Sequence, residues 1–306
     1  MYGCQKNRIN SNSKTIPILE HICSTANNLT NCGIYLARQK WFEKNKIVGK
    51  YDLEKALKDQ INFKALHSQC AQQVLRSVAE SFKSFQGLRK AFFKREISNH
   101  PKLPNYRKKR GMTVASYPKQ ALKLKDNQVR IPLGKKIKAW FGLSEFFVPF
   151  PSNLEWGKIK ELRFLPRNRE FYVEWVYEKP EPKININSKE ALGIDSGIDN
   201  WLTCVSTIGG SFIVDGRKLK SLNQNYNRRV ASLKEGKPQG YWDSELARIT
   251  EKRNRQIRDA VNKAAKMVVN YCLNKGIGII VFGWNEGQRQ GINIGRKNNQ
   301  NVRIQV

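Results

Sequence analysis

The chain has 306 residues, 40% of them hydrophobic, which suits about two globular domains and argues against disorder. Its 56 lysines and arginines against 25 acidic residues give a formal net charge of +31, which predicts a polyanionic partner. No run approaches the roughly 18 apolar residues of a membrane span, and the polar start is unlike a signal peptide. Because the basic residues are spread along the whole chain, nucleic acid is favoured over a membrane surface.

The six cysteines include no C-x-x-C pair, so we expect no zinc site within this chain. Cys23, Cys70 and Cys272 fall in apolar helical patterns, which predicts small buried thiols rather than disulfides.

Helical periodicity dominates a region from about residue 15 to 97. Residues 18–41 and 63–93 carry apolar side chains at nearly the 3.6-residue period, which predicts two helices. The polar face of the second helix includes Gln73 and Arg76. That face is either simply solvated or contacts phosphates and bases, and both readings stay open.

Residues 98–111 break the helical pattern with two prolines and a dense basic run. Basic side chains next to an aromatic ring suit phosphate contact combined with base stacking, although a charge run alone is often a solvated loop. We take five consecutive residues as candidate nucleic-acid contacts: Tyr106, Arg107, Lys108, Lys109 and Arg110.

From residue 114 to 178 the period changes to two, as in strands. P-R-N-R at 166–169 predicts the turn of a hairpin between strands 159–165 and 171–177. Several short strands with glycine and proline punctuation favour a small β-barrel. Residues 178–188, with P-E-P-K-I-N-I-N-S, read as a linker.

The most informative segment is A-L-G-I-D-S-G-I-D-N at 191–200. An apolar strand delivers Asp195 and turns at Gly197, and a second β-rich run follows. A carboxylate inside a sheet is costly unless a cation compensates it, and Mg²⁺ prefers carboxylate oxygens. Asp195 is therefore the candidate metal ligand and catalytic residue, whereas Asp199 and Asp215 are better read as turn residues.

Beyond this segment we expect strands at 202–206 and 211–214, then a helix at 253–275 whose basic face includes Arg255, a further candidate nucleic-acid contact. The run I-G-I-I-V-F at 277–282 predicts a buried strand parallel to the strand that carries Asp195.

These blocks, in this order, resemble the TnpB (OrfB) proteins of insertion sequences, which are RNA-guided nucleases related to type V CRISPR effectors. The resemblance is carried by M-Y-G-C-Q at 1–5, L-T-N-C-G-I-Y-L-A-R-Q at 29–39, P-K-L-P-N-Y-R-K-K at 101–109, G-I-D-S-G-I-D-N-W-L-T at 193–203, E-K-R-N-R-Q-I-R-D-A-V-N-K-A-A at 251–265 and N-I-G-R-K-N-N-Q-N at 293–301.

The resemblance implies a mixed α and β chain. A helical recognition region would be inserted in a small β-barrel over residues 1–187, followed by an RNase H-like (RuvC) α/β nuclease domain over 188–306. It implies Mg²⁺ as cofactor and a guide RNA and a DNA target as partners. It also implies a location in the prokaryotic cytoplasm, associated with the nucleoid. Asp195 matches the first catalytic aspartate of the family.

One departure concerns the second carboxylate, because the family commonly has a glutamate where this chain has Gly283. Glu286 follows three residues later and is a candidate catalytic residue, although a surface-loop carboxylate is the simpler reading. The last aspartate of the family is absent as well, so we expect a nuclease domain that is incomplete at its C-terminus.

Two functions remain: a metal-dependent, RNA-guided DNA endonuclease or transposase that is impaired in this chain, or an inactive guide-RNA and DNA-binding protein that acts as a repressor or remnant. A basic protein of ordinary RNA metabolism would leave Asp195 unexplained.

Overall fold

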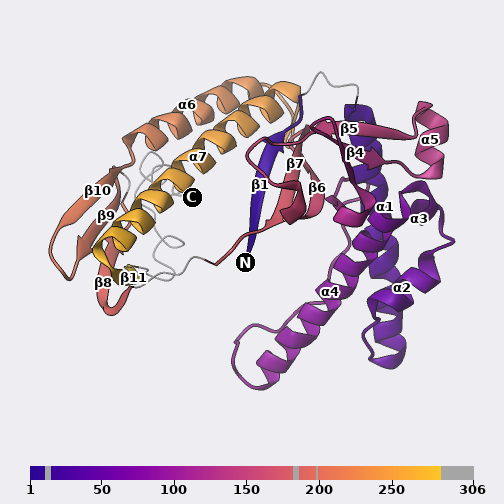
Figure 1. Cartoon of the computed structure of the whole chain (residues 1–306), viewed down its shortest axis with the longest axis horizontal. Coiled ribbons are helices and arrows are strands. Elements are labelled where there is room, and N and C mark those ends of the chain that lie inside the picture. Colours follow the sequence, from indigo (N-terminus) through magenta and orange to yellow (C-terminus); the bar gives the residue numbers. More distant parts are fainter. Residues whose placement is uncertain (11–14, 182–185, 198, 284–306) are drawn as a thin grey trace. The chain divides into compact units, whose positions relative to one another are not determined.

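The computed structural model describes residues 1–10, 15–181, 186–197 and 199–283. The chain divides into two units, Met1–Glu181 and Pro182–Val306, which are described separately (Figure 1). Across the described ranges, no helix combines the length and the apolar character that a membrane span needs. The functional assignment of domains 1–187 and 188–306 stays a prediction.

Five α-helices are described in the first unit: α1 (Ile16–Lys44), α2 (Lys50–Leu57), α3 (Ile61–Ala65), α4 (Ser68–Phe93) and α5 (Lys135–Phe141). The helix predicted at 18–41 is confirmed as α1, which packs beside α4 (Figure 1). The single helix predicted at 63–93 is wrong in part, because the chain is extended at Leu66 and His67 and separates α3 from α4. Leu66 is only 3% exposed, so its burial holds the break in place.

Seven strands of the first unit form two antiparallel sheets, in the orders β1-β7-β6-β2 and β3-β4-β5. Their bounds are β1 Tyr2–Arg8, β2 Ala115–Pro118, β3 Lys123–Lys125, β4 Gln128–Pro132, β5 Glu145–Pro149, β6 Ile159–Arg167 and β7 Glu170–Glu178. The predicted hairpin is confirmed as β6 and β7. Its turn has positive φ angles at Asn168 and Arg169, which suits the right-handed twist of the two strands.

The expected β-barrel is not seen, since the described strands form open sheets. At one edge, β2 is four residues long and ends at Pro118, which has no backbone N–H to donate to a further strand. At the other edge, β1 pairs with β7 alone.

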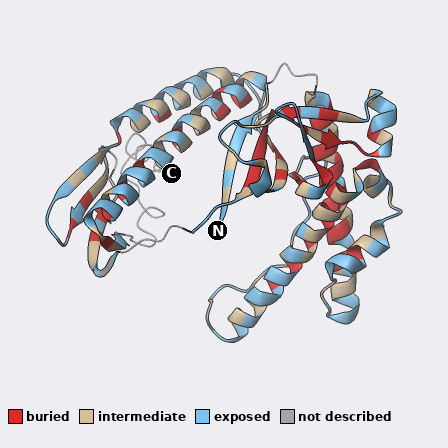
Figure 2. Ribbon diagram, in the orientation of Figure 1, coloured by how far each residue is buried: buried red, intermediate tan, exposed pale blue. Residues whose placement is uncertain are grey.

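One hydrophobic core joins the facing sides of α1 and α4 to the sheets of the first unit (Figure 2). Trp175, Tyr117 and Phe82 are among its fully buried side chains. Cys23 and Cys70 are buried in it as predicted, and burial raises the pKa of the Cys70 thiol to about 12. These thiols are packing groups of the core.

The second unit holds a four-stranded sheet and two long helices: β8 (Asn187–Asp195), β9 (Asn200–Ser206), β10 (Ser211–Asp215), α6 (Arg217–Lys234), α7 (Ser244–Lys275) and β11 (Ile277–Phe282). The helix predicted at 253–275 begins earlier, because Asp243 caps α7 by accepting a hydrogen bond from the N–H of Leu246 at 2.7 Å. Gly276, with φ of +69°, ends α7 and leads directly into β11.

The sheet order of the second unit is β10-β9-β8-β11, with β11 parallel to β8 as predicted. The predicted burial of β11 is wrong beyond Ile277, since the following residues reach 59% exposure at Phe282. The second unit has a small hydrophobic core of its own, formed by side chains of β8, β9, α7 and the first residue of β11. Because β11 is an edge strand, Ile277 is its one residue that this core buries among the described residues.

Candidate nucleic-acid interface

Residues 104–113, here called the clamped segment, form the later part of the connection from α4 to β2 and are held along α1 by side chains of that helix. The amide of Asn31 donates to the carbonyl of Arg107 at 3.1 Å and accepts from the N–H of Arg107 at 2.7 Å. Asn27 donates to the carbonyl of Lys108 at 3.0 Å, and Arg38 donates to that of Pro104 at 3.1 Å. These contacts fix the backbone of the segment.

The clamp leaves the predicted contact residues on the surface. Tyr106 and the four basic residues after it are all exposed. Within the described part of the chain, no carboxylate lies within ion-pair distance of Arg107, Lys108, Lys109 or Arg110. Uncompensated positive charge on a fixed backbone attracts phosphates and limits the entropy lost when they bind.

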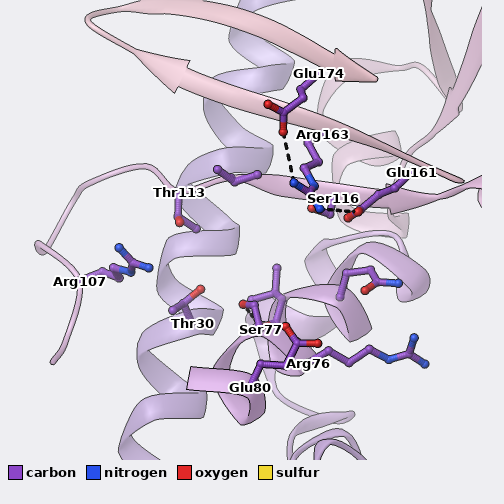
Figure 3. A pocket seen from close by; sticks show the side chains of 13 residues that line it. Thr30, Arg76, Ser77, Glu80, Arg107, Thr113, Ser116, Glu161, Arg163 and Glu174 are labelled. Atoms are coloured by element: carbon purple, nitrogen blue, oxygen red, sulfur yellow. Dashed lines mark hydrogen bonds and ion pairs between the residues drawn. The ribbon is translucent and has the colours of Figure 1, made fainter. Parts of the chain in front are cut away.

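Beside the clamped segment lies a cavity of about 390 Å³ between α1, α4 and the sheet (Figure 3). The structure brings three predicted contact residues together in its wall, since Gln73, Arg76 and Arg107 all line it. An adjoining cavity of about 420 Å³ shares Thr30, Ser77 and Arg107 with the first and also contacts Tyr106. We call these two the paired cavities.

The floor of the first cavity is an ion-pair network on the polar face of the sheet. Arg163 donates to Glu161 at 2.8 Å and to Glu174 at 3.3 Å, as Figure 3 shows. Glu174 also pairs with Lys6 at 3.2 Å. Burial disfavours the charged Arg163 guanidinium, but its two carboxylate partners outweigh burial and raise its pKa. The floor is thus locally neutralised.

Arg76 differs from the basic residues 107–110 because its charge has a partner among the described residues. Its Nε lies 3.5 Å from Oε1 of Glu54 on α2. Of the basic side chains that line the cavity, Arg107 is therefore the one without an ion-pair partner among the described residues.

Hydroxyl and amide groups give the cavity its recognition chemistry. Gln73 and Ser116 can supply both donors and acceptors to its wall. The hydroxyls of Thr30 and Ser77 donate to the carbonyls of Ala26 and Val74 at 2.8 and 2.7 Å, so these two offer acceptors. Such groups can read the edges of bases, while basic groups at the rim hold phosphates and fix the register. The geometry suits a nucleic acid whose backbone follows the clamped segment.

Sequence reasoning missed the residues that build the clamp. Asn27, Asn31 and Arg38 lie on one face of α1, where spacings of four and seven residues place side chains together. That spacing is visible in the sequence, but the partner segment lies more than 60 residues away, with separations of 66 to 81 residues.

The second unit contains the other predicted residues. Arg255 is partly buried on α7. Asp195 ends β8, and its side chain is exposed rather than enclosed by the sheet, so the expectation of a buried carboxylate is wrong. The reason is that the strand ends at this residue, and its side chain lies at the rim of the small core.

The end of β11 meets Asp195. The N–H of Gly283 donates to the carbonyl of Ile194 at 2.8 Å. A Cβ atom built on Gly283 would lie 3.4 Å from Oδ1 of Asp195, so position 283 directly faces the carboxylate.

The two nearby aspartates are held by cations. Lys220 donates to Asp199 at 2.9 Å. Hydrogen bonds from the Arg217 side chain and backbone lower the pKa of Asp215 to about 2.

The described residues do not by themselves fit a magnesium ion. Among them, no three histidine, cysteine or acidic side chains lie close enough together to hold a metal. Asp195 faces a glycine, and Glu286 lies outside the described residues.

Comparison with known proteins adds to this geometry. Residues 174–287 match the OrfB_IS605 family, described as "Probable transposase". A solved structure titled "Cryo-EM structure of the Cas12f1-sgRNA-target DNA complex" matches with a TM-score of 0.54 and 12% identity, over 94% of this chain and 69% of that chain. Another, titled "Cryo-EM structure of CRISPR-Cas12f Ternary Complex", matches with a TM-score of 0.35 and 11% identity over the same shares. No curated protein matches the chain. The first of these likenesses shows a common fold.

Proposed function

We propose, from the membership of residues 174–287 in the OrfB (TnpB) family of transposon proteins, that this chain binds a guide RNA and its DNA target and that its phosphodiester hydrolysis is impaired. The family relationship supports a transposon-associated, RNA-guided nuclease type. The binding and hydrolysis parts of the proposal depend on different units of the chain.

The binding part is supported by the clamped segment and the paired cavities. The exposed basic side chains would hold phosphates, and the polar groups of the first cavity, Gln73 among them, would contact base edges. In an RNA-guided protein, base pairing supplies most of the sequence specificity, and the protein reads a short flanking motif and the backbone. A diffuse charge of +31 suits that task.

The hydrolysis part depends on a single observation, the contact between Gly283 and Asp195. Two-metal phosphodiester hydrolysis needs several carboxylates around the ions, so that the attacking and leaving oxygens are both stabilised. The position that faces Asp195 has no side chain to contribute. With Asp195 as the one carboxylate that the described residues place at this strand end, we expect binding without efficient cutting.

The test is a cleavage assay on the full chain with Mg²⁺, the RNA from the element's end and a matching DNA. We expect a complex that survives electrophoresis and a DNA that stays intact, with Asp195→Ala changing neither result. Cutting that is abolished by Asp195→Ala would refute the impairment and favour the endonuclease, with Glu286 or another residue outside the described part completing the site.

Binding itself has a separate check. Affinity that depends mainly on phosphate contacts falls steeply between low and moderate salt. A flat salt response would contradict a phosphate-binding surface. Equal affinity for unrelated RNAs would favour a general RNA-binding protein over a guided one.

A further inference from the structure

An aromatic and arginine stripe lies on the surface of α1, next to the clamped segment. Arg38 lies three residues after Tyr35 and four residues before Phe42, and these spacings place the three side chains on one helix face. Tyr106 of the clamped segment lies beside them. The three rings are 57%, 65% and 49% exposed for Tyr35, Phe42 and Tyr106, far more than aromatic side chains that pack a core.

Arg38 joins two of these rings. Its guanidinium carbon lies 5.3 Å from the ring centre of Tyr106 and 5.9 Å from that of Phe42, within cation–π range of both. Its hydrogen bond to the carbonyl of Pro104 fixes the guanidinium in place. In the described chain no carboxylate pairs with it, so its positive charge remains uncompensated beside the two rings.

The charge around the stripe selects among possible partners. The stripe borders the exposed basic run 107–110, and the chain as a whole carries +31. A second copy of so basic a protein would be repelled, and an ordinary apolar surface would leave the charges uncompensated. Nucleic acid brings both the negative charge and flat rings.

A double helix keeps its base faces stacked inside, whereas unpaired nucleotides present theirs to aromatic and arginine side chains. Seven helical residues separate Tyr35 from Phe42, about 10 Å along the axis, so the stripe has room for more than one stacked base.

We propose that Tyr35, Arg38, Phe42 and Tyr106 form a stacking platform for unpaired nucleotides of the nucleic acid whose phosphates the basic run holds. The proposal rests on the proposed function for the phosphate contacts. It adds a site that distinguishes unpaired nucleotides from a double helix. Unpaired RNA and unpaired DNA share this chemistry, and the experiment separates them.

The experiment measures binding of the full chain to single-stranded RNA, single-stranded DNA and duplex DNA of about ten nucleotides, a length in the range of known single-strand sites. Each single strand carries 2-aminopurine, whose fluorescence is quenched by stacking. The variants are Phe42→Ala, Tyr35→Ala and Arg38→Lys. The matched control is Tyr51→Ala, which removes an aromatic ring that is 68% exposed and lies 4.8 Å from Lys50 on α2.

We expect the two alanine variants to weaken unpaired binding by about 5- to 150-fold each, the range known for loss of one stacked base. They should also reduce the quenching at saturation and leave duplex binding unchanged. Arg38→Lys keeps the charge but loses the planar group, so quenching should fall more than affinity. Tyr51→Ala should match the parent chain, and the stronger of the RNA and DNA arms identifies the source of the strand.

Unchanged unpaired binding in all three variants, with salt-sensitive duplex binding intact, would overturn the platform and leave the proposed function standing. No binding of any oligonucleotide by the parent chain would refute the proposed function instead. A variant that shifts the mass of the protein from two copies to one, without changing oligonucleotide binding, would show a protein interface and overturn the platform. Phe42→Tyr keeps a ring at the same place and should bind as the parent does, which separates stacking from misfolding.

Discussion

Replacing Gly283 with glutamate should create a second carboxylate beside Asp195 and make the stability of the protein depend on magnesium. The backbone at position 283 is held by its hydrogen bond to Ile194, and a Cβ there meets Asp195 at an ordinary contact distance of 3.4 Å. Glycine has no unusual φ at this position, so glutamate can occupy it without backbone strain.

The size of the effect follows from Coulomb's law. Two carboxylates roughly 5 Å apart repel each other by about 3 kcal/mol at an effective dielectric of about 20, and by about 1 kcal/mol in water. Because Asp195 is exposed, the lower half of this range applies, about 1 to 2 kcal/mol. For a chain of this size that is a decrease in Tm of roughly 2 to 8 °C. Mg²⁺ bound between the carboxylates should remove the decrease.

The assay is thermal unfolding of Gly283→Glu with and without Mg²⁺, alongside Gly283→Gln as a control of equal size and no charge. We expect a magnesium-dependent rise in Tm for the glutamate variant and none for the glutamine variant. Equal losses of Tm in both variants, insensitive to Mg²⁺, would refute the inference that a side chain at position 283 faces the carboxylate of Asp195.

Replacing Lys108 and Lys109 together with alanine should reduce the slope of log affinity against log salt by about 2 for duplex DNA, because each lost phosphate contact removes about 0.9; an unchanged slope in filter-binding assays would place the phosphates elsewhere. The pKa of Asp215 is lowered to about 2 by Arg217, so the stabilisation it provides is present above the ordinary value near pH 4 and is lost as the pH falls toward 2. An NMR titration of the Asp215 carboxyl should show this midpoint, and Arg217→Ala should return it toward the ordinary value. Burial, with smaller effects of nearby basic side chains, lowers the pKa of His67, so the unfolded chain takes up the proton first and the free energy of unfolding should decrease as the pH falls below about 6.5. Urea unfolding at neutral and mildly acidic pH should show a weaker pH dependence in His67→Gln, and an equal dependence in both proteins would contradict the role of this ring.

The elements predicted well from the sequence are those that local patterns determine. The β6–β7 hairpin follows from alternation and a turn whose Asn168 and Arg169 accept positive φ. The long helix α1 follows from its periodic apolar residues, and β11 from an apolar run after a helix-ending glycine.

What the sequence could not show depends on distant partners. Strand β1 has a mostly polar sequence, and it is a strand because Tyr2–Arg8 pairs with β7, far along the chain. Helix α2 buries Leu53 alone, so its periodic signal is weak. The side-chain exposure of Asp195 follows from the size of the core around β8, which no local pattern gives.

The candidate interface divides in the same way. The local run of basic residues next to an aromatic ring was enough to indicate Tyr106 and the four residues after it. Their display depends on amides of Asn27 and Asn31 that reach backbone atoms many residues later, and that contact has no local signature.

The clamp on residues 104–113 has an evolutionary consequence. Asn27 and Asn31 form hydrogen bonds with backbone atoms of Arg107 and Lys108, and these bonds do not involve the side chains of Arg107 and Lys108. Mutations can therefore exchange the displayed side chains one at a time while the path of the backbone is preserved. A protein built this way can change the chemistry of this surface without first losing its fold, and an engineer could vary the same positions by the same route.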